Sequence, residues 1–277
     1  MRFSLCTFTL TFQKVFCLFA FTLILWPANS PAKESTPFEP GEELTFNLRW
    51  GLFDVGTAVL TVNPMAEIDG EEVWHFTMTI RTNSFADNFY RVRDRVDGYL
   101  TKDFQRSLLY LRKQEGSHKR DVRVEFDWEK NQVTYINEGE AREPLDLEDY
   151  SFDPLSVFFK FRTLDLTPGS SMELPVTDGR RFVDGVGTVE AGQTIRVPAG
   201  EFETVLALPD MRDVGAAFDQ AEGATLRIWL SDDERRLPVR LSSRVVVGSF
   251  HAELVDILGE ELPPPPPTRP KIRRQRR

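Results

Sequence analysis

Residues 74–81 read Trp74-His75-Phe76-Thr77-Met78-Thr79-Ile80-Arg81. Large apolar side chains alternate with polar ones through the whole stretch. Because successive side chains of a β-strand point to opposite faces, this alternation places one face against a core and the other toward water. The stretch therefore predicts a half-buried strand in an antiparallel sheet.

The same two-residue period recurs on both sides of this stretch. It is clear in residues 44–50, 121–128, 226–230 and 237–241. Turn sequences separate such segments, and Asp69-Gly70 is typical of a tight hairpin. Many short strands without long helices between them favour a sandwich or a barrel. We therefore predict an all-β fold built on a large antiparallel curved sheet, as a barrel or half-barrel.

One segment breaks the strand pattern. Asp153 can cap a first helical turn, and Pro154 suits the first helical position. Residues 155–162 then place apolar side chains almost all round a helix. Because such a helix must be covered on most sides, we predict a short helix over about 153–163, packed in the mouth of the sheet. A weaker helical turn is predicted over residues 84–89.

The N-terminal residues 1–32 are typical of a secretory signal peptide. Arg2 and Lys14 supply positive charge, and an apolar run covers residues 15–25. That run is shorter than the roughly 20 residues that a membrane span requires. We expect a periplasmic protein whose signal is cleaved near Ala32, with an uncleaved N-terminal anchor as the alternative. Both cysteines lie in this segment, so the mature chain would contain no thiol or disulfide.

The C-terminal residues 263–277 also differ in composition from the rest. Five prolines precede six cations, which predicts a disordered, basic, Pro-rich tail. The chain has 34 Lys and Arg residues, of which two lie in residues 1–32 and six in this tail. Residues 33–262, predicted to be a single β domain, therefore hold 26 cations against 43 Asp and Glu residues, a net charge of about −17. This charge argues against nucleic acid as a partner, because duplex binding depends on neutralising phosphates. Two roles for the tail stay open: weak contact with an anionic envelope surface, or no role beyond that of an unselected solubilising end.

Several short motifs follow one another along the chain. They are Phe38-Glu39-Pro40-Gly41-Glu42-Glu43-Leu44-Thr45-Phe46, Val55-Gly56-Thr57-Ala58, Asp153-Pro154-Leu155-Ser156, Val197-Pro198-Ala199-Gly200-Glu201-Phe202, Ile228-Trp229-Leu230-Ser231-Asp232-Asp233 and Arg236-Leu237-Pro238-Val239. In this order they resemble an uncharacterised family of exported proteins of Gram-negative bacteria, the domain of unknown function 3108. The resemblance covers nearly all of residues 38–258. It implies an envelope location and a mainly β, barrel-like fold, and the family has no established activity or catalytic residues to carry over. In architecture alone, the chain also resembles periplasmic lipoprotein carriers, whose curved sheet holds acyl chains against a helix.

No catalytic constellation is evident in the sequence. The three histidines, His75, His118 and His251, lie in separate segments. His251 and Glu253 would share a strand face and could share a metal, and residues 232–234 look like an ion-binding loop. A solvated strand face and an exposed hairpin loop explain both patterns better, because residues 232–234 lack the regular oxygen-ligand spacing of a calcium loop. We therefore predict a non-enzymatic protein without a metal or other cofactor.

Aromatic rings and one carboxylate form the candidate ligand pocket. The rings are Trp50, Trp74, Phe76, Phe126, Trp128, Phe158, Phe159 and Phe161. Asp94 joins them because it shares a strand face with Val92 and Val96. An inward carboxylate needs a cationic or hydrogen-bonding partner, so Asp94 is a structural ion pair or a ligand-orienting group, unless the register is reversed and it is exposed. A barrel of more than about eight strands leaves space that side chains need not fill.

Three functions remain open at this point. The first is a non-enzymatic envelope protein that binds an apolar or amphipathic, lipid-like ligand between helix and sheet. The alternative is a structural or interaction protein with a filled core, acting through its acidic surface and basic tail. The third is a hydrolase, which would need Asp94 or a histidine beside a second titratable group. Nothing in the sequence indicates an oligomeric state.

Overall fold

The computed structural model describes residues 36–210, 225–245 and 248–258. The predicted signal peptide (1–32) and the predicted basic tail (263–277) lie outside these residues. The described residues fall within one compact unit. Among them, no helix has both the length and the apolar character that crossing a membrane requires.

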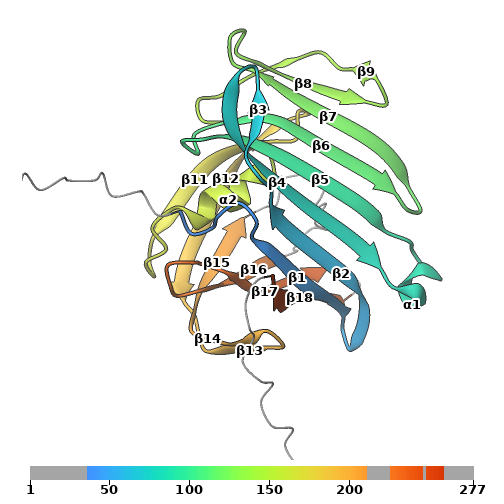
Figure 1. The fold of residues 1–277 in the computed structure, drawn as a ribbon, viewed down its shortest axis with the longest axis vertical. Helices are drawn as coiled ribbons and strands as arrows, with labels where there is room; N and C mark the ends of the chain where they lie inside the picture. The colour runs from blue at the N-terminus through green and yellow to red at the C-terminus, as the bar shows by residue number, and fades with distance from the viewer. Residues whose placement is uncertain (1–35, 211–224, 246–247, 259–277) are drawn as a thin grey trace, which may run out of the picture. The chain divides into compact units, whose positions relative to one another are not determined.

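One antiparallel sheet of sixteen strands dominates the fold (Figure 1). From one edge to the middle its strands are β10 (Leu145–Asp146), β8 (Gln132–Asn137), β7 (Lys119–Asp127), β6 (Ser107–Glu115), β5 (Arg93–Thr101), β4 (Glu71–Thr82) and β2 (Phe53–Val62). They continue to the other edge as β1 (Glu43–Trp50), β18 (Gly248–Ile257), β17 (Pro238–Val245), β16 (Thr225–Ser231), β15 (Thr204–Asp210), β12 (Phe182–Ala191) and β11 (Ser171–Thr177). The all-β, antiparallel prediction is confirmed.

Four short strands lie off this path. β3 (Ala66–Ile68) pairs with β4, and β9 (Glu140–Ala141) pairs with β8. β13 (Ile195–Val197) and β14 (Gly200–Phe202) form a separate two-stranded sheet. The Asp69-Gly70 turn joins β3 to β4 with positive φ at both residues, as a tight hairpin turn requires.

The segment before the second helix ties one edge of the sheet to a strand near the other edge. Phe152 N donates to Pro175 O at 2.9 Å, and Thr177 N donates to Phe152 O at 2.9 Å, so Phe152 pairs with the edge strand β11 as an isolated parallel bridge. One residue earlier, Ser151 O accepts from Ser107 N of β6 at 3.0 Å. These bonds hold β11 close to β6 and curl the sheet into a barrel-like form.

Two short helices interrupt the strands. α2 (Ser156–Arg162) lies against the concave side of the sheet, at the predicted place but over fewer residues than 153–163. It starts late because Asp153 Oδ1 accepts from Leu155 N at 2.8 Å and from Ser156 N at 2.9 Å, which fixes residues 153–155 as a capping turn. α1 (Ser84–Asp87) falls within the weaker predicted turn over 84–89.

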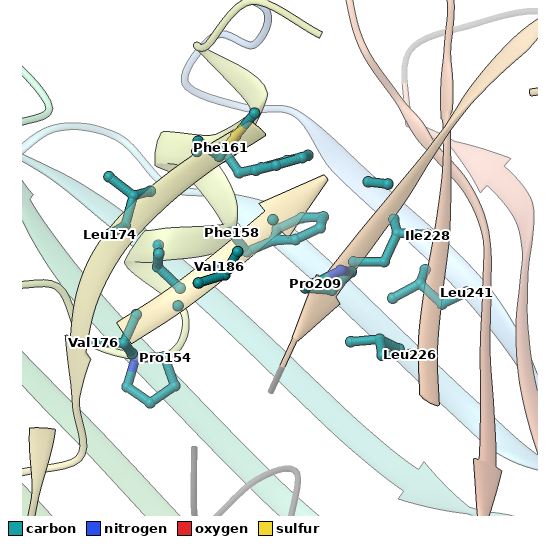
Figure 2. Close-up of a pocket in the computed structure, with 15 residues that line it drawn as sticks. Pro154, Phe158, Phe161, Leu174, Val176, Val186, Pro209, Leu226, Ile228 and Leu241 are labelled. Carbon is teal, nitrogen blue, oxygen red and sulfur yellow. The ribbon is translucent and has the colours of Figure 1, made fainter. Parts of the chain in front are cut away.

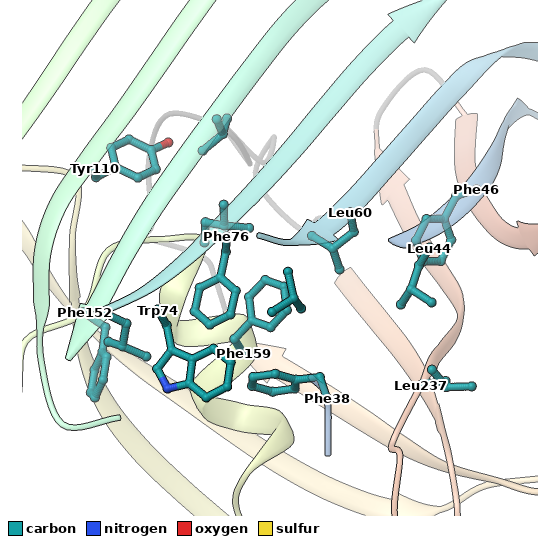
Figure 3. Packing of buried hydrophobic residues seen from close by; sticks show 14 of the residues in the cluster. Phe38, Leu44, Phe46, Leu60, Trp74, Phe76, Tyr110, Phe152, Phe159 and Leu237 are labelled. Atoms are coloured by element: carbon teal, nitrogen blue, oxygen red, sulfur yellow. The ribbon is translucent and has the colours of Figure 1, made fainter. Parts of the chain in front are cut away.

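The larger core cluster packs between α2 and the first strands of the chain (Figure 3). Phe159 of α2 stacks flat on Phe76 of β4, with ring centroids 3.7 Å apart and planes 8° apart. Phe38 meets both rings edge-on, at 5.7 Å and 5.2 Å. A smaller apolar cluster lies under β12, β15 and β16, and Phe158 and Phe161 pack against it from the helix. The helix therefore has one face in a filled core and another toward this second cluster.

Candidate functional site

An apolar cavity lies between α2 and the C-terminal half of the sheet (Figure 2). Its volume is about 100 Å3. The lining residues are Pro154, Val157, Phe158, Phe161, Met172, Leu174, Val176, Gly185, Val186, Gly187, Ala207, Pro209, Leu226, Ile228 and Leu241. Every one of these residues is apolar, so the cavity suits a hydrocarbon rather than a polar group.

Small residues opposite the helix create the space. Gly185 and Gly187 of β12 have no side chain, and Ala207 of the neighbouring β15 contributes only a methyl group. A Cβ atom placed on Gly187 would lie 3.2 Å from Cε2 of Phe161. A side chain at Gly187 would therefore press against the Phe161 ring, so this glycine allows helix and sheet to approach each other closely.

Two of the predicted pocket residues, Phe158 and Phe161, line this cavity. Phe159 points instead into the filled core, where it stacks with Phe76. Trp74 stacks on Phe76 in turn, with centroids 6.1 Å apart. These last three rings fill space rather than border it.

Phe126 and Trp128 also lie outside the lining of the apolar cavity. Phe126 is buried in the larger core cluster, and Trp128 is half-buried beside it. The indole Nε1 of Trp128 donates to Ser107 O at 2.8 Å, and the Arg106 guanidinium lies 5.4 Å from the indole ring. Both rings therefore stabilise the β6–β7 part of the sheet.

Trp50 does not face the interior, so this part of the predicted pocket is wrong. Its side chain is 42% exposed and stacks on Phe250, with centroids 6.2 Å apart. Burial decreases along β1, from Leu44 and Phe46, which are buried, to Leu48, which is half-buried. The two-residue period is correct, but β1 extends past the part of the sheet that other elements cover.

Asp94 has the partners that an inward carboxylate requires. Gln114 Nε2 donates to Asp94 Oδ2 at 2.7 Å, and Arg112 Nη2 lies 3.9 Å from the same oxygen. Asp94 shares its strand face with the buried Val96 and is not part of the cavity lining. The structure thus favours a structural polar network over a ligand-orienting role.

The sequence matches one family model, described as "Protein of unknown function (DUF3108)", over residues 45–255. This chain belongs to the DUF3108 family. The family resemblance seen in the sequence motifs is thereby confirmed.

The DUF3108 chain is also similar in fold to a solved structure, the beta-barrel-like protein of domain of unknown function DUF1849 from Brucella abortus. The TM-score is 0.51 at 12% sequence identity, and the similarity covers 78% of this chain and 96% of that chain. At this identity the likeness concerns the fold alone, and it agrees with the predicted barrel-like architecture. No curated protein matches the DUF3108 chain.

The acidic loop of residues 232–234 and the C-terminal histidine of the DUF3108 chain are the two ion sites that the sequence suggested. Asp233 Oδ1 accepts from Ser231 Oγ at 2.7 Å and from the backbone N–H groups of Arg235 and Arg236 at 3.0 and 3.1 Å. This carboxylate thus closes the β16–β17 turn. His251 lies on β18, and in the described ranges no three His, Cys, Asp or Glu side chains are close enough to hold a metal.

A polar cluster on the convex face of the DUF3108 sheet is absent from the sequence-based predictions. Asp97 of β5 lies 2.9 Å from His75 Nε2 of β4, and it accepts from Thr77 Oγ1 at 2.7 Å. Arg95 donates to both carboxylate oxygens, at 2.8 and 2.7 Å. Tyr99 stacks on the His75 ring at 4.4 Å. The alternation of residues 74–81 predicts that His75 and Thr77 share the wetted face of the strand. Their contact with Asp97 depends on the β4–β5 register, which the sequence does not reveal.

This histidine–carboxylate pair is the arrangement that the hydrolase hypothesis required. In a catalytic triad, one imidazole nitrogen faces the carboxylate and the other faces a nucleophile. Here the nearby hydroxyl, that of Thr77, donates to Asp97 and lies 3.5 Å from the same Nε2 that faces the carboxylate. The cluster therefore has the geometry of a hydrogen-bonded ion network rather than of a nucleophile and its base.

The Asp97 cluster predicts a pH-dependent stability. Burial raises the pKa of Asp97, but hydrogen bonds from His75, Arg95 and Thr77 outweigh burial and hold this pKa well below its usual range. The contribution of Asp97 to stability is therefore complete above the unfolded-state pKa of about 3.9 and is lost as the pH falls through the folded-state value. At pH 7, Asp97→Asn should lower the free energy of unfolding by about 1–3 kcal/mol.

Urea denaturation between pH 7 and pH 2 checks this prediction. The difference between the natural protein and Asp97→Asn should be constant down to about pH 4 and then shrink. Asp184→Asn, at an exposed carboxylate, is the matched control and should stay close to the natural protein throughout. A difference that persists unchanged to pH 2 would refute the assigned role of the Asp97 carboxylate.

Proposed function

We propose that this protein is a non-enzymatic carrier or sensor that binds an apolar or amphipathic, lipid-like ligand in the cavity beside α2. The observation that supports this function most strongly is the uniformly apolar lining of this cavity. Water gains little in such a space because the lining offers it no hydrogen-bonding side chain. A hydrocarbon chain would instead gain about 0.8 kcal/mol for each methylene group that it buries.

The proposal places the protein in the periplasm. Residues 1–32 have the composition of a signal peptide, and we propose that it is removed near Ala32. A carrier of apolar molecules is needed where such molecules must cross an aqueous compartment. An exported protein with an acidic, soluble body of about −17 charge would meet that need.

Fluorescence titration with N-phenyl-1-naphthylamine, a neutral apolar probe, tests the proposal. We expect one saturable site per chain, and saturated fatty acids should displace the probe. Because each buried methylene adds about 0.8 kcal/mol, fatty-acid affinity should rise about fourfold per added methylene until the cavity is full. Absence of saturable probe binding, or affinity that is independent of chain length, would contradict the proposal.

A second function, that of an interaction protein, is supported by a separate observation. Most of the exposed large apolar side chains in the described part of the chain gather at one end of the sheet, and we name these seven residues the aromatic rim. They are Trp50, Leu52, Phe53, Phe85, Phe89, Tyr90 and Phe250. Phe53 stacks on Phe85 at 5.6 Å, which joins the β1–β2 turn to α1. Large contiguous apolar patches of this kind are typical of contact surfaces.

Substitution at the two most exposed rim residues tests this second function. Leu52 is 87% exposed and Phe89 is 77% exposed, so Leu52→Ser with Phe89→Ser should leave the fold intact. If the rim is a contact surface, the natural protein should self-associate at rising concentration or bind phospholipid vesicles, and the double variant should lose that association. If the natural protein stays monomeric and does not bind vesicles, the rim does not support an interaction function.

A further inference from the structure

A second cavity, of opposite character, lies toward the β8 edge of the sheet. Its volume is about 240 Å3. Three separate segments each contribute a guanidinium: strand β7, the residue after β9 and the turn between β11 and β12. We name this cavity the arginine cavity. Its polar lining consists of Arg120, Arg142, Arg180, Tyr135, Asn137 and Glu140.

Tyr135 holds two of these guanidinium groups in place. The Tyr135 ring is only 6% exposed, and the Cζ atoms of Arg142 and Arg180 lie 5.0 Å and 5.8 Å from its centroid. Both distances are in the range of cation–π contact. Asp178 fixes Arg180 further, because Arg180 Nε donates to Asp178 Oδ2 at 2.8 Å. Two cations are therefore positioned in advance at one edge of the cavity.

The local charge of the arginine cavity is opposite to that of the whole body. Three guanidiniums face a single lining carboxylate, that of Glu140, and Asp178 offsets part of the charge of Arg180. Within the described part of the chain, Arg120 and Arg142 form no ion pair. In a domain with a net charge of about −17, such a concentration of cations focuses positive potential on one concave site.

A buried polar atom in the same cavity also lacks a partner. Among the described residues, no hydrogen-bonding group contacts Asn137 Oδ1, although this atom is buried. Buried polar atoms without partners are rare and often mark a site for a ligand or water. Because the oxygen and nitrogen of an amide exchange places by a simple flip, Asn137 can present either an acceptor or an N–H donor to a bound group.

We propose that the arginine cavity binds a phosphate group. Arginine forks bind phosphate oxygens in pairs, and three forks from different directions match a tetrahedral anion with several oxygens better than a planar carboxylate. A soluble phosphate compound and a phospholipid headgroup share this chemistry. The inference goes beyond the proposed apolar ligand, since the lining residues of the two cavities do not overlap.

Isothermal titration calorimetry on the full chain tests the inference with two probes, inorganic phosphate and dihexanoyl phosphatidic acid. We expect saturable binding of one phosphate group per chain, weakened by added NaCl. Binding of both probes would identify a site for soluble phosphate compounds. Binding of dihexanoyl phosphatidic acid alone would identify a headgroup site. If neither probe binds saturably, the inference is wrong.

Matched variants assign the binding to this cavity. Arg120→Ala with Arg142→Ala should weaken phosphate affinity at least tenfold, whereas Arg91→Ala with Arg227→Ala removes two exposed cations elsewhere and should change it little. Equal losses in both double variants would indicate a long-range charge effect and overturn the site. Arg120→Lys with Arg142→Lys keeps both positive charges but removes the two guanidinium forks, so we expect a phosphate affinity between those of the natural protein and the alanine variant. This lysine variant also tests the site if the alanine variant does not fold. Each variant is also titrated with N-phenyl-1-naphthylamine. Probe binding without phosphate binding would contradict the phosphate site alone, and phosphate binding without probe binding would contradict the apolar site alone.

Discussion

Replacing Arg162 with alanine should lower the free energy of unfolding by about 3–5 kcal/mol. The Arg162 side chain is fully buried, and its Nη1 donates to Glu42 Oε1 at 2.8 Å. Its Nε and Nη2 donate to the backbone carbonyls of Arg236 and Arg235, at 3.2 and 3.0 Å. The alanine variant would leave the Glu42 carboxylate and both carbonyls without these donors, and this loss is the reason for the large effect.

Arg162 matters because it joins three segments that are far apart in the chain. It lies on α2, Glu42 precedes β1, and residues 235–236 belong to the β16–β17 turn. Its guanidinium also lies 4.8 Å from the Phe38 ring in the core. Burial lowers the pKa of Arg162, and the Glu42 carboxylate opposes this shift. The guanidinium remains charged because arginine side chains are not deprotonated in folded proteins.

Urea denaturation at pH 7 measures the effect of Arg162→Ala. Arg227→Ala, at an exposed position on β16, is the matched control and should change stability by less than about 0.5 kcal/mol. Glu42→Gln keeps an oxygen acceptor for Arg162 and should cost less than Arg162→Ala. If Arg162→Ala lowers the free energy of unfolding by less than about 1 kcal/mol, the effect is that of an exposed ion pair. This result would contradict the stabilising role of Arg162 as a buried ion pair.

Replacing Ala207 with tryptophan should weaken binding of N-phenyl-1-naphthylamine at least tenfold. Ala207 is 1% exposed, sits on β15 and faces the apolar cavity beside α2. The indole would occupy space that the proposed ligand needs. Because the cavity can receive part of the ring, the cost in stability should stay near the 1–3 kcal/mol that is typical of overpacked cores.

Two further variants make this prediction decisive. Leu206→Trp adds the same ring at the adjacent residue of β15, whose side chain points to the opposite face of the sheet, so probe binding should persist. Leu241→Trp fills the cavity from β17 and should also remove binding, which covers the case in which Ala207→Trp does not fold. Undiminished binding in folded Ala207→Trp and Leu241→Trp would place the probe elsewhere.

Local sequence pattern was sufficient to predict the strands with a clear two-residue period and the helix α2. The alternation around Trp74 and Phe76 predicted their common face, and both rings are buried in the core. Asp153 predicted the capping of α2, although the helix itself begins three residues later. Such features depend on neighbours along the chain and are therefore visible in the sequence.

The candidate site was less predictable because it depends on neighbours across the sheet. Phe158 and Phe161 were visible as apolar rings, but the space before them results from Gly185, Gly187 and Ala207 on strands whose order the sequence does not reveal. Glycines at alternate positions of one strand were the available signal, since glycine in a strand often marks a close approach or a ligand.

The burial of some side chains depends on contacts that the strand period alone does not reveal. Trp50 follows the period of β1, yet its ring stacks on Phe250 and is 42% exposed. His75 and Asp97 show the reverse case. The alternation of residues 74–81 predicted that His75 faces water, and no prediction was made for Asp97. The β4–β5 register brings the two side chains together and leaves Asp97 only 7% exposed.

Native mass spectrometry with organic extraction, on protein purified from the cell envelope of its own host, tests the ligand-binding proposal most directly. We predict a co-purifying apolar or amphipathic mass at close to one molecule per chain, reduced in the Ala207→Trp variant. A chain mass without bound ligand, unchanged after incubation with envelope lipids, would contradict a carrier or sensor function and favour an interaction protein acting through its aromatic rim.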